Sequence, residues 1–172
     1  MKRDPALQPL SREHLTALML SYCLKHGRSS NPRYPWPADP REQVERVQQS
    51  WAQELRWHFE AEERFFFGPL LPTLPAPLQA MTRQLLAEHR AIETRIQAFD
   101  DLSDADLPDA LSSLGHLLET HVRCEEREYF EQLQQAVPAE QLAKAGAALE
   151  AFYAEREPVR CLFTGTLRPA GS

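Results

Sequence analysis

Four histidines lie where the buried face of a helix would normally carry apolar side chains: His14, His58, His89 and His121. Three of them have a glutamate about one turn downstream, in the segments His58-Phe-Glu-Ala-Glu62, His89-Arg-Ala-Ile-Glu93 and His121-Val-Arg-Cys-Glu125-Glu126. A helix brings residues four apart onto one face, so each pair directs an imidazole and a carboxylate to the same side. These groups suit iron, manganese or zinc. A chain with this pattern is therefore predicted to gather its helices around a metal site.

Helix signals, separated by proline and glycine, dominate the chain. The predicted helices span residues 11–26, 40–67, 76–99, 106–136 and 138–157. Ser11 and Asp39 are the expected N-caps of the first two helices, and Gly27 is expected to end the first. Four long helices with short connections and an added fifth predict an all-α, up-down four-helix bundle.

Length, charge and cysteine content limit the class of protein. We expect one domain over residues 1–172, with the metal-binding bundle at about 11–136, a C-terminal helix at about 138–157 and a tail. The net charge of −6 and the absence of a basic stripe argue against nucleic-acid binding. No apolar stretch approaches the ~18 residues of a membrane span. The start of the chain lacks a signal peptide, and the three cysteines are widely separated, which indicates a cytoplasmic protein with reduced thiols.

The apolar stripes predict that the four histidines point inward. In the second helix the series steps by three or four residues through Val44, Val47, Trp51, Leu55, His58, Glu62 and Phe65. His89 follows Leu85 by four, and His121 adjoins Val122, so both lie on core faces. An unpaired polar group costs about 1–3 kcal/mol to bury. Four imidazoles with several carboxylates therefore favour a metal site over the alternative of a buried His–Glu hydrogen-bond network.

These residues resemble the hemerythrin-like, or HHE cation-binding, domain family over residues 11–136. The resemblance rests on His14 in Ser-Arg-Glu-His and on the three segments quoted above, with Glu88 before His89 and Glu63 after Glu62. It implies a non-haem di-iron centre with two irons per chain. On that basis Glu62 and Glu126 would bridge the irons, His14 and His58 would bind one iron, and His89 and His121 would bind the other.

The identity of the second bridging residue depends on which spacing is followed. Straight helix geometry prefers Glu125, four residues after His121, whereas the family spacing prefers Glu126. The apolar pattern also favours Glu126, because Val122 and Phe130 flank it at minus four and plus four. We predict Glu126 as the ligand, with Glu125 as the alternative.

Glu93 marks a departure from the oxygen-carrying members of the family, which have a second histidine at this position. A carboxylate here would add negative charge and favour ferric over ferrous iron, which argues against reversible oxygen carriage. Glu93 is one of the predicted metal ligands; the alternative is that it turns outward and leaves an open metal position.

The expected function is that of a di-iron protein that binds or senses dioxygen or a related small molecule, and this role is favoured over that of an enzyme. One alternative is an enzyme at the same site, acting on peroxide or nitric oxide or in iron release and repair. Another is a structural or interaction domain with a degenerate or zinc-filled site. Iron is the expected metal, with zinc and manganese as alternatives. The fifth helix would either cover the bundle or form the contact surface of a homodimer. His116 lies five residues before His121 and off the ligand face.

Overall fold

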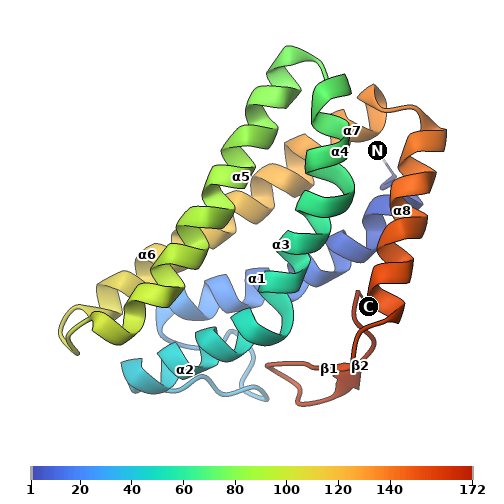
Figure 1. Ribbon diagram of the computed structural model, residues 1–172. Coiled ribbons are helices and arrows are strands. Elements are labelled where there is room, and N and C mark those ends of the chain that lie inside the picture. Colours follow the sequence, from blue (N-terminus) through green and yellow to red (C-terminus); the bar gives the residue numbers. More distant parts are fainter. Residues whose placement is uncertain (1, 172) are drawn as a thin grey trace.

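The computed structural model describes residues 2–171, and four main helices with a C-terminal helix make up most of them, as predicted (Figure 1). The first is α1, Gln8–His26, preceded by the 3-10 turn η1, Pro5–Leu7. The N-cap of α1 is Leu7 and not the predicted Ser11, and prolines are tolerated in a first helical turn. Asp4 caps the preceding turn η1, where its carboxylate accepts a hydrogen bond from the Ala6 amide. The helix ends at Gly27, whose φ of 62° is the left-handed conformation expected of a C-cap glycine.

The second long helix is continuous but changes its winding twice. It consists of α2 (Pro40–Ser50), a π-helical turn η2 (Trp51–Leu55), α3 (Arg56–Glu62), a second π-helical turn η3 (Glu63–Phe67) and α4 (Gly68–Leu70), followed by the 3-10 turn η4 (Leu71–Thr73). The predicted N-cap is confirmed, since the Asp39 carboxylate accepts a hydrogen bond from the Arg41 amide at 2.9 Å.

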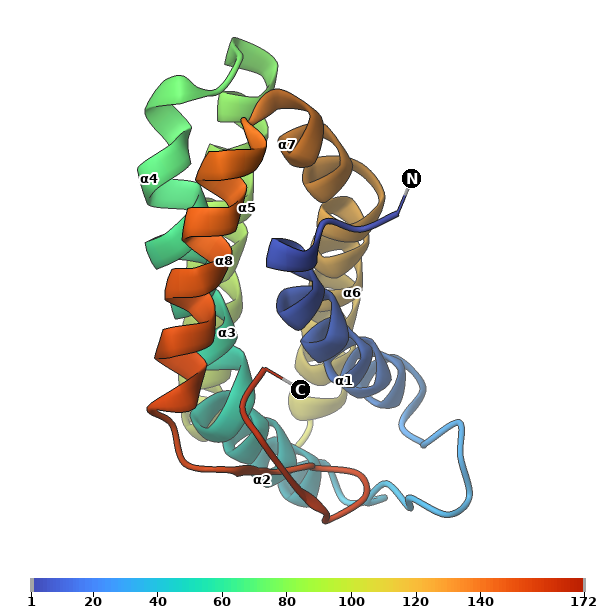
Figure 2. The ribbon, with the colours of Figure 1, turned by 90° about the vertical axis from the view of Figure 1, so that its right-hand side faces the viewer.

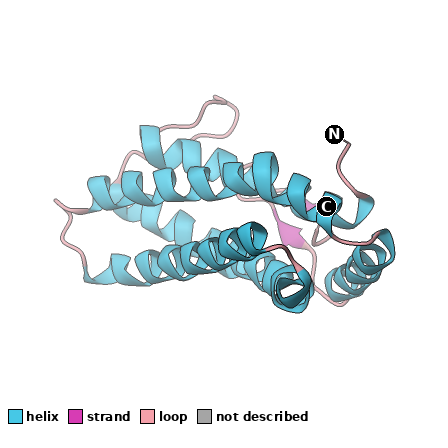
Figure 3. Cartoon of the chain, turned by 90° about the horizontal axis from the view of Figure 1, so that it is seen from above, coloured by secondary structure: helices cyan, strands magenta, loops and turns pink. Residues whose placement is uncertain are grey.

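The third and fourth helices complete the bundle. α5 spans Ala76–Gln97 and leads into the 3-10 turn η5, Ala98–Asp101. The fourth comprises α6 (Leu107–Cys124), a π-helical turn η6 (Glu125–Tyr129) and α7 (Phe130–Ala136). Seen from above, the long helices lie side by side (Figure 3).

The chain beyond the bundle is more structured than the predicted tail. Helix α8, Ala139–Ala154, lies beside the bundle, and an added Cβ on its Gly146 would stand 2.7 Å from the Ala6 Cβ. The strands β1 (Val159–Arg160) and β2 (Leu167–Arg168) then pair antiparallel, which the sequence did not predict. After this hairpin the chain returns towards α1 (Figure 2).

The hydrophobic core is divided into two clusters, and on each long helix a histidine lies at the division. On α1, Leu10 belongs to one cluster and Leu20 to the other, with His14 between them. On α5, Leu85 and Ile92 flank His89 in the same way. Within residues 2–171 no helix combines the length and apolar character of a membrane span.

Candidate metal centre

The four histidines converge in the middle of the bundle, one from each long helix. All are buried, with exposed fractions of 4% or less. They form two pairs: the Nε2 atoms of His14 and His58 are 2.9 Å apart, and those of His89 and His121 are 3.1 Å apart. The predicted inward orientation of all four side chains is therefore confirmed.

Two inner carboxylates, Glu62 and Glu125, lie between these pairs and are fully buried. Glu62 Oε1 is 3.3 Å from His58 Nε2, while its Oε2 is 3.3 Å from His89 Nε2. Glu125 Oε2 is 3.2 Å from His14 Nε2, while its Oε1 is 3.4 Å from His121 Nε2. Each carboxylate thus offers one oxygen to each pair. The result is two ligand clusters, each with two histidines, that share both carboxylates.

A ring of four outer carboxylates fixes the histidines from behind. Glu13 accepts a hydrogen bond from His58 Nδ1 (2.9 Å), Glu63 from His89 (2.9 Å), Glu88 from His121 (2.9 Å) and Glu126 from His14 (2.6 Å). Each long helix therefore holds the histidine of the next one, and the fourth closes the ring on the first. Because an ionised carboxylate only accepts hydrogen bonds, each Nδ1 carries the proton, and each Nε2 is directed inward, where it could bind a cation.

This donor set fits a pair of metal ions. Both oxygens of Glu62 and Glu125 are buried and, among the described residues, lack a hydrogen-bonding partner in good geometry. Two Nε2 atoms that face each other at about 3 Å also need a shared proton or a metal ion between them. A cation in each cluster would satisfy the nitrogens and the buried carboxylate oxygens together.

Comparison with known sequences decides the family. Residues 10–133, well over half of the chain, match the profile of the hemerythrin HHE cation binding domain. The chain belongs to the hemerythrin HHE family. Neither the curated proteins nor the solved structures gave a match. The resemblance predicted from the histidine and glutamate segments is thus confirmed for the family, and the region beyond residue 133 lies outside the match.

Electrostatics in this hemerythrin domain follow from burial opposed by charge pairing. Burial disfavours the charged form of His58, but Glu62 and Glu13 outweigh it and raise the pKa of His58 to about 9. The same balance, with Glu125, Glu126 and Glu62 as partners, holds the pKa of His14 well above its usual value. The pKa of Glu62 lies well below its usual value despite burial, because His58 and the neighbouring histidines stabilise its charge.

The outer carboxylates are also held ionised. Burial raises their pKa values, but in Glu126 the hydrogen bonds from His14 and Arg3 outweigh it and lower the pKa to about 2. The pKa values of Glu13 and Glu63 are lowered in the same way by His58 and His89, against burial. These groups therefore stay negative and keep accepting from the Nδ1 atoms at neutral pH.

Aromatic rings pack directly on the ligand imidazoles. Phe59 stacks on His89 with ring centroids 3.8 Å apart, and Phe130 stacks on His14 at 5.7 Å. Both phenylalanines are buried. An apolar wall of this kind restricts the access of water to the centre and fixes the orientation of the imidazole rings.

The structure places Glu125, and not the predicted Glu126, among the clustered side chains. Glu125 is the residue in both clusters, while Glu126 is partly exposed and bonds His14 Nδ1 and Arg3. The apolar pattern misled because the turn after Glu125 is π-helical, which adds one residue to it. Phe130 is buried, but it follows Glu125 by five residues, so a step of four from Phe130 does not identify the inward residue. The second π-turn, η3, explains in the same way why Phe66 and Phe67 are buried and the predicted Phe65 is only partly buried.

Glu93 is not part of either cluster. Its carboxylate lies on the outer face of α5, 3.6 Å from Arg90 and within hydrogen-bonding distance of Gln97. The predicted assignment of Glu93 as a metal ligand therefore does not agree with this geometry, and the alternative of an outward side chain does. His116 is exposed, as expected of a residue off the ligand face. Cys124 is half-buried, and burial followed by nearby carboxylates raises its pKa to about 11, so it is a poor thiolate ligand.

Sequence reasoning did not predict the outer ring, although a simple signal was present. Each outer carboxylate is the immediate sequence neighbour of an inner ligand, in Glu13-His14, Glu62-Glu63, Glu88-His89 and Glu125-Glu126. Neighbouring residues in a helix point about 100° apart. A residue next to an inward ligand therefore faces an adjacent helix, where it can reach that helix's histidine.

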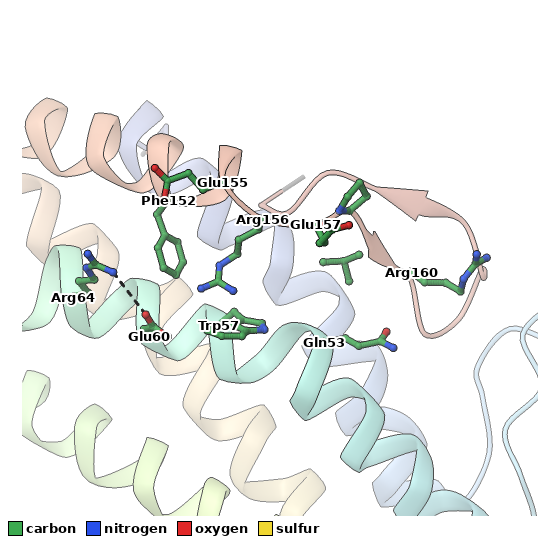
Figure 4. Close-up of a pocket in the computed structure, with 11 residues that line it drawn as sticks. Gln53, Trp57, Glu60, Arg64, Phe152, Glu155, Arg156, Glu157 and Arg160 are labelled. Atoms are coloured by element: carbon green, nitrogen blue, oxygen red, sulfur yellow. Dashed lines mark ion pairs between the residues drawn. The ribbon is translucent and has the colours of Figure 1, made fainter.

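A surface pocket of about 660 Å³ lies away from the centre, between the second long helix and the end of α8 (Figure 4). Within it the guanidinium of Arg156 lies between two rings, 3.4 Å from the centroid of Trp57 and 4.2 Å from that of Phe152. Such cation–π stacking ties the end of α8 to the helix that carries His58. The pocket contains none of the cluster residues.

Proposed function

We propose that this chain is a non-haem di-iron protein of the hemerythrin type that binds or senses dioxygen or a related small molecule. The observation that carries the proposal is the pair of clusters that share Glu62 and Glu125, each completed by two histidines. On this assignment His14 and His58 would hold one iron, His89 and His121 the other, and the two inner carboxylates would bridge them.

The ligand chemistry suits iron but does not by itself distinguish iron from zinc or manganese. Mixed imidazole and carboxylate donors suit iron, zinc and manganese. A carboxylate shared between two ions offsets positive charge on both, which suits two hard cations at close range. Four protein donors per ion also leave open positions on an ion that prefers octahedral coordination, and iron in such a site supplies electron exchange with small oxidants.

The surroundings favour a very small ligand. A cavity of about 10 Å³ adjoins His58 and is lined by Glu13, Glu54 and other buried side chains. A volume of this size accommodates about one water-sized molecule. Phe59 and Phe130 also pack on the imidazoles, and this close packing favours a diatomic ligand over an organic substrate.

The outward position of Glu93 bears on the type of iron chemistry. A carboxylate ligand there would have favoured ferric iron, but the side chain pairs with Arg90 instead. The only negatively charged protein ligands of each proposed iron are then the two shared carboxylates. This supports binding of a small molecule by the reduced protein, and it weakens the argument against oxygen binding that the sequence gave.

Elemental analysis of the purified full chain, prepared without chelators, tests the proposal. We expect about two irons per chain, and His58→Ala and His121→Ala should each lower the metal content, whereas the exposed His116→Ala should not. Zinc alone, or little metal after anaerobic ferrous reconstitution, would contradict the proposal in favour of a structural domain. Repeated turnover of peroxide or nitric oxide by the reduced protein, in place of stoichiometric uptake, would instead favour an enzyme.

A further inference from the structure

Glu13 is the most enclosed of the four outer carboxylates. Its side chain is 11% exposed, compared with 15% for Glu88, 23% for Glu63 and 26% for Glu126. Both of its oxygens are used: Oε2 accepts from His58 Nδ1 at 2.9 Å, and Oε1 accepts from the Gly171 amide at 3.1 Å. A third bond comes from the Tyr153 hydroxyl, which donates to Oε2 at 2.5 Å.

The partners of Glu13 come from a part of the chain outside the family match. Tyr153 is buried on α8, and Gly171 lies near the end of the C-terminal segment, both beyond residue 133. The other outer carboxylates are held differently: Glu126 by Arg3 at 2.7 Å, Glu88 by Gln84 at 2.9 Å, and Glu63 by the exposed Arg90. Only the outer carboxylate behind His58, among the described residues, is held by α8 and the segment that follows it.

Several contacts fix this C-terminal segment in place. Gly171 has a φ of 73° and lies against the Tyr153 ring, where an added Cβ would be 2.4 Å from the ring carbon Cδ2. Arg12 donates to the Gly171 carbonyl at 3.1 Å, and Arg168 bonds the buried Glu54 at 2.6 Å. The stacking of Arg156, three residues after Tyr153, holds the end of α8 against Trp57 (Figure 4).

We propose that Tyr153 and Gly171 are positioning residues that hold Glu13 against His58 and thereby strengthen metal binding in the cluster of His14 and His58. The inference rests on the proposed function, because it requires two bound ions. A carboxylate that accepts from a ligand imidazole fixes its orientation and raises its basicity, and losing such a partner typically weakens metal binding 10–100-fold. With one oxygen shared by His58 and Tyr153 and the other held by Gly171, Glu13 is restricted to one orientation. The two metal positions are therefore unequal, and the C-terminal segment sets the difference.

Stepwise Co²⁺ titration of the metal-free full chain, followed by visible absorption, tests this inference. We expect two binding steps in the unmodified protein, and Tyr153→Phe should weaken one of them about tenfold and leave the other unchanged. His58→Ala identifies that step by abolishing it. Tyr129→Phe is the matched control, because it also removes a buried hydroxyl, but one that contacts Thr82 and no outer carboxylate; both steps should stay within about twofold.

A second variant guards against misfolding of the first. Gly171→Ala introduces a Cβ at a positive φ and against the Tyr153 ring, so it should displace the segment and weaken the same step. Equal weakening of both steps, or no change in either variant, would overturn the inference and leave the proposed function standing. An unmodified protein that binds fewer than two Co²⁺ ions contradicts the proposed function, and the inference with it, before any variant is compared.

Discussion

Replacing Glu125 and Glu126 one at a time by glutamine separates the inner from the outer role. Glu125 lies 3.2 Å from His14 Nε2 and 3.4 Å from His121 Nε2, so it belongs to both clusters. A carboxamide in its place has one good ligand oxygen and no charge. We expect Glu125→Gln to weaken the binding of both ions. Glu126→Gln should weaken only the binding of the ion near His14, because Glu126 contacts no other cluster histidine, and to a smaller extent, because the amide oxygen can still accept from Nδ1.

The expected magnitudes differ enough to be measured. A 100-fold loss of affinity at saturating metal removes about 2.7 kcal/mol of stabilisation per ion, so about 5 kcal/mol for two ions. For a chain of this size each kcal/mol shifts the melting temperature by about 2–4 °C, which gives a decrease of about 10–20 °C for Glu125→Gln. A tenfold loss at one ion, about 1.4 kcal/mol, predicts a decrease of only about 3–6 °C for Glu126→Gln.

The quantity to measure is the difference between the melting temperatures of the metal-loaded and chelated forms of each variant. This difference removes the effect of each substitution on the metal-free protein. Elemental analysis of the same samples should give fewer than two irons for Glu125→Gln and close to two for Glu126→Gln. If Glu126→Gln lost more metal and more metal-dependent stability than Glu125→Gln, the assignment of the bridging residue would be refuted.

Three further predictions concern pH and packing. Because the pKa of His58 is raised to about 9 and its Nε2 must be free to bind a metal, metal affinity should rise with pH and level off above about 9; equal proton release in calorimetry at pH 7 and pH 10 would contradict this. In the metal-free protein the raised pKa of His58 contributes stability that is fully present below about pH 6.5 and is lost as pH rises through about 9. The midpoint of urea denaturation should therefore fall between these pH values, and it should change less with pH in His58→Gln. Gly115→Ala would place a Cβ 2.9 Å from Leu24 Cβ and from the Ser21 carbonyl, and should destabilise the α1–α6 contact by about 1–3 kcal/mol in urea denaturation without lowering the metal content.

The sequence was sufficient for the helices and for the inward histidines. Proline and glycine placed the connections, and the recurrence of His58 and His89 within apolar stripes required a polar centre in the core. It was not sufficient for the second inner carboxylate, because a π-helical turn that begins at Glu125 alters the phase that a regular helix would keep. A change of one residue in a turn depends on tertiary packing, and the spacing of apolar residues does not record it in advance.

The contacts of the C-terminal segment could not be predicted from the spacing of apolar residues, for a different reason. Tyr153 and Gly171 meet Glu13 across more than 130 positions of the chain. No local pattern predicts such a contact, and the short β1–β2 pair that precedes Gly171 has only two residues in each strand. The ring of outer carboxylates was partly predictable. Each member adjoins an inner cluster residue in sequence, but its hydrogen bond is to a histidine on another helix.

The ring of outer carboxylates also specifies the handedness of the bundle. On α1 and α5 the outer residue precedes the histidine by one position, a rotation of roughly −100°, and on the two antiparallel helices it follows the histidine by five, a rotation of roughly +140°. Antiparallel helices reverse the sense of rotation when seen from one end, so all four carboxylates turn the same way around the bundle axis. A bundle wound in the opposite sense would direct them away from the neighbouring imidazoles. In the mirror-image arrangement Leu15, which follows His14, would take the place of Glu13. Leu15 is 66% exposed, and its apolar side chain cannot accept a hydrogen bond from an imidazole.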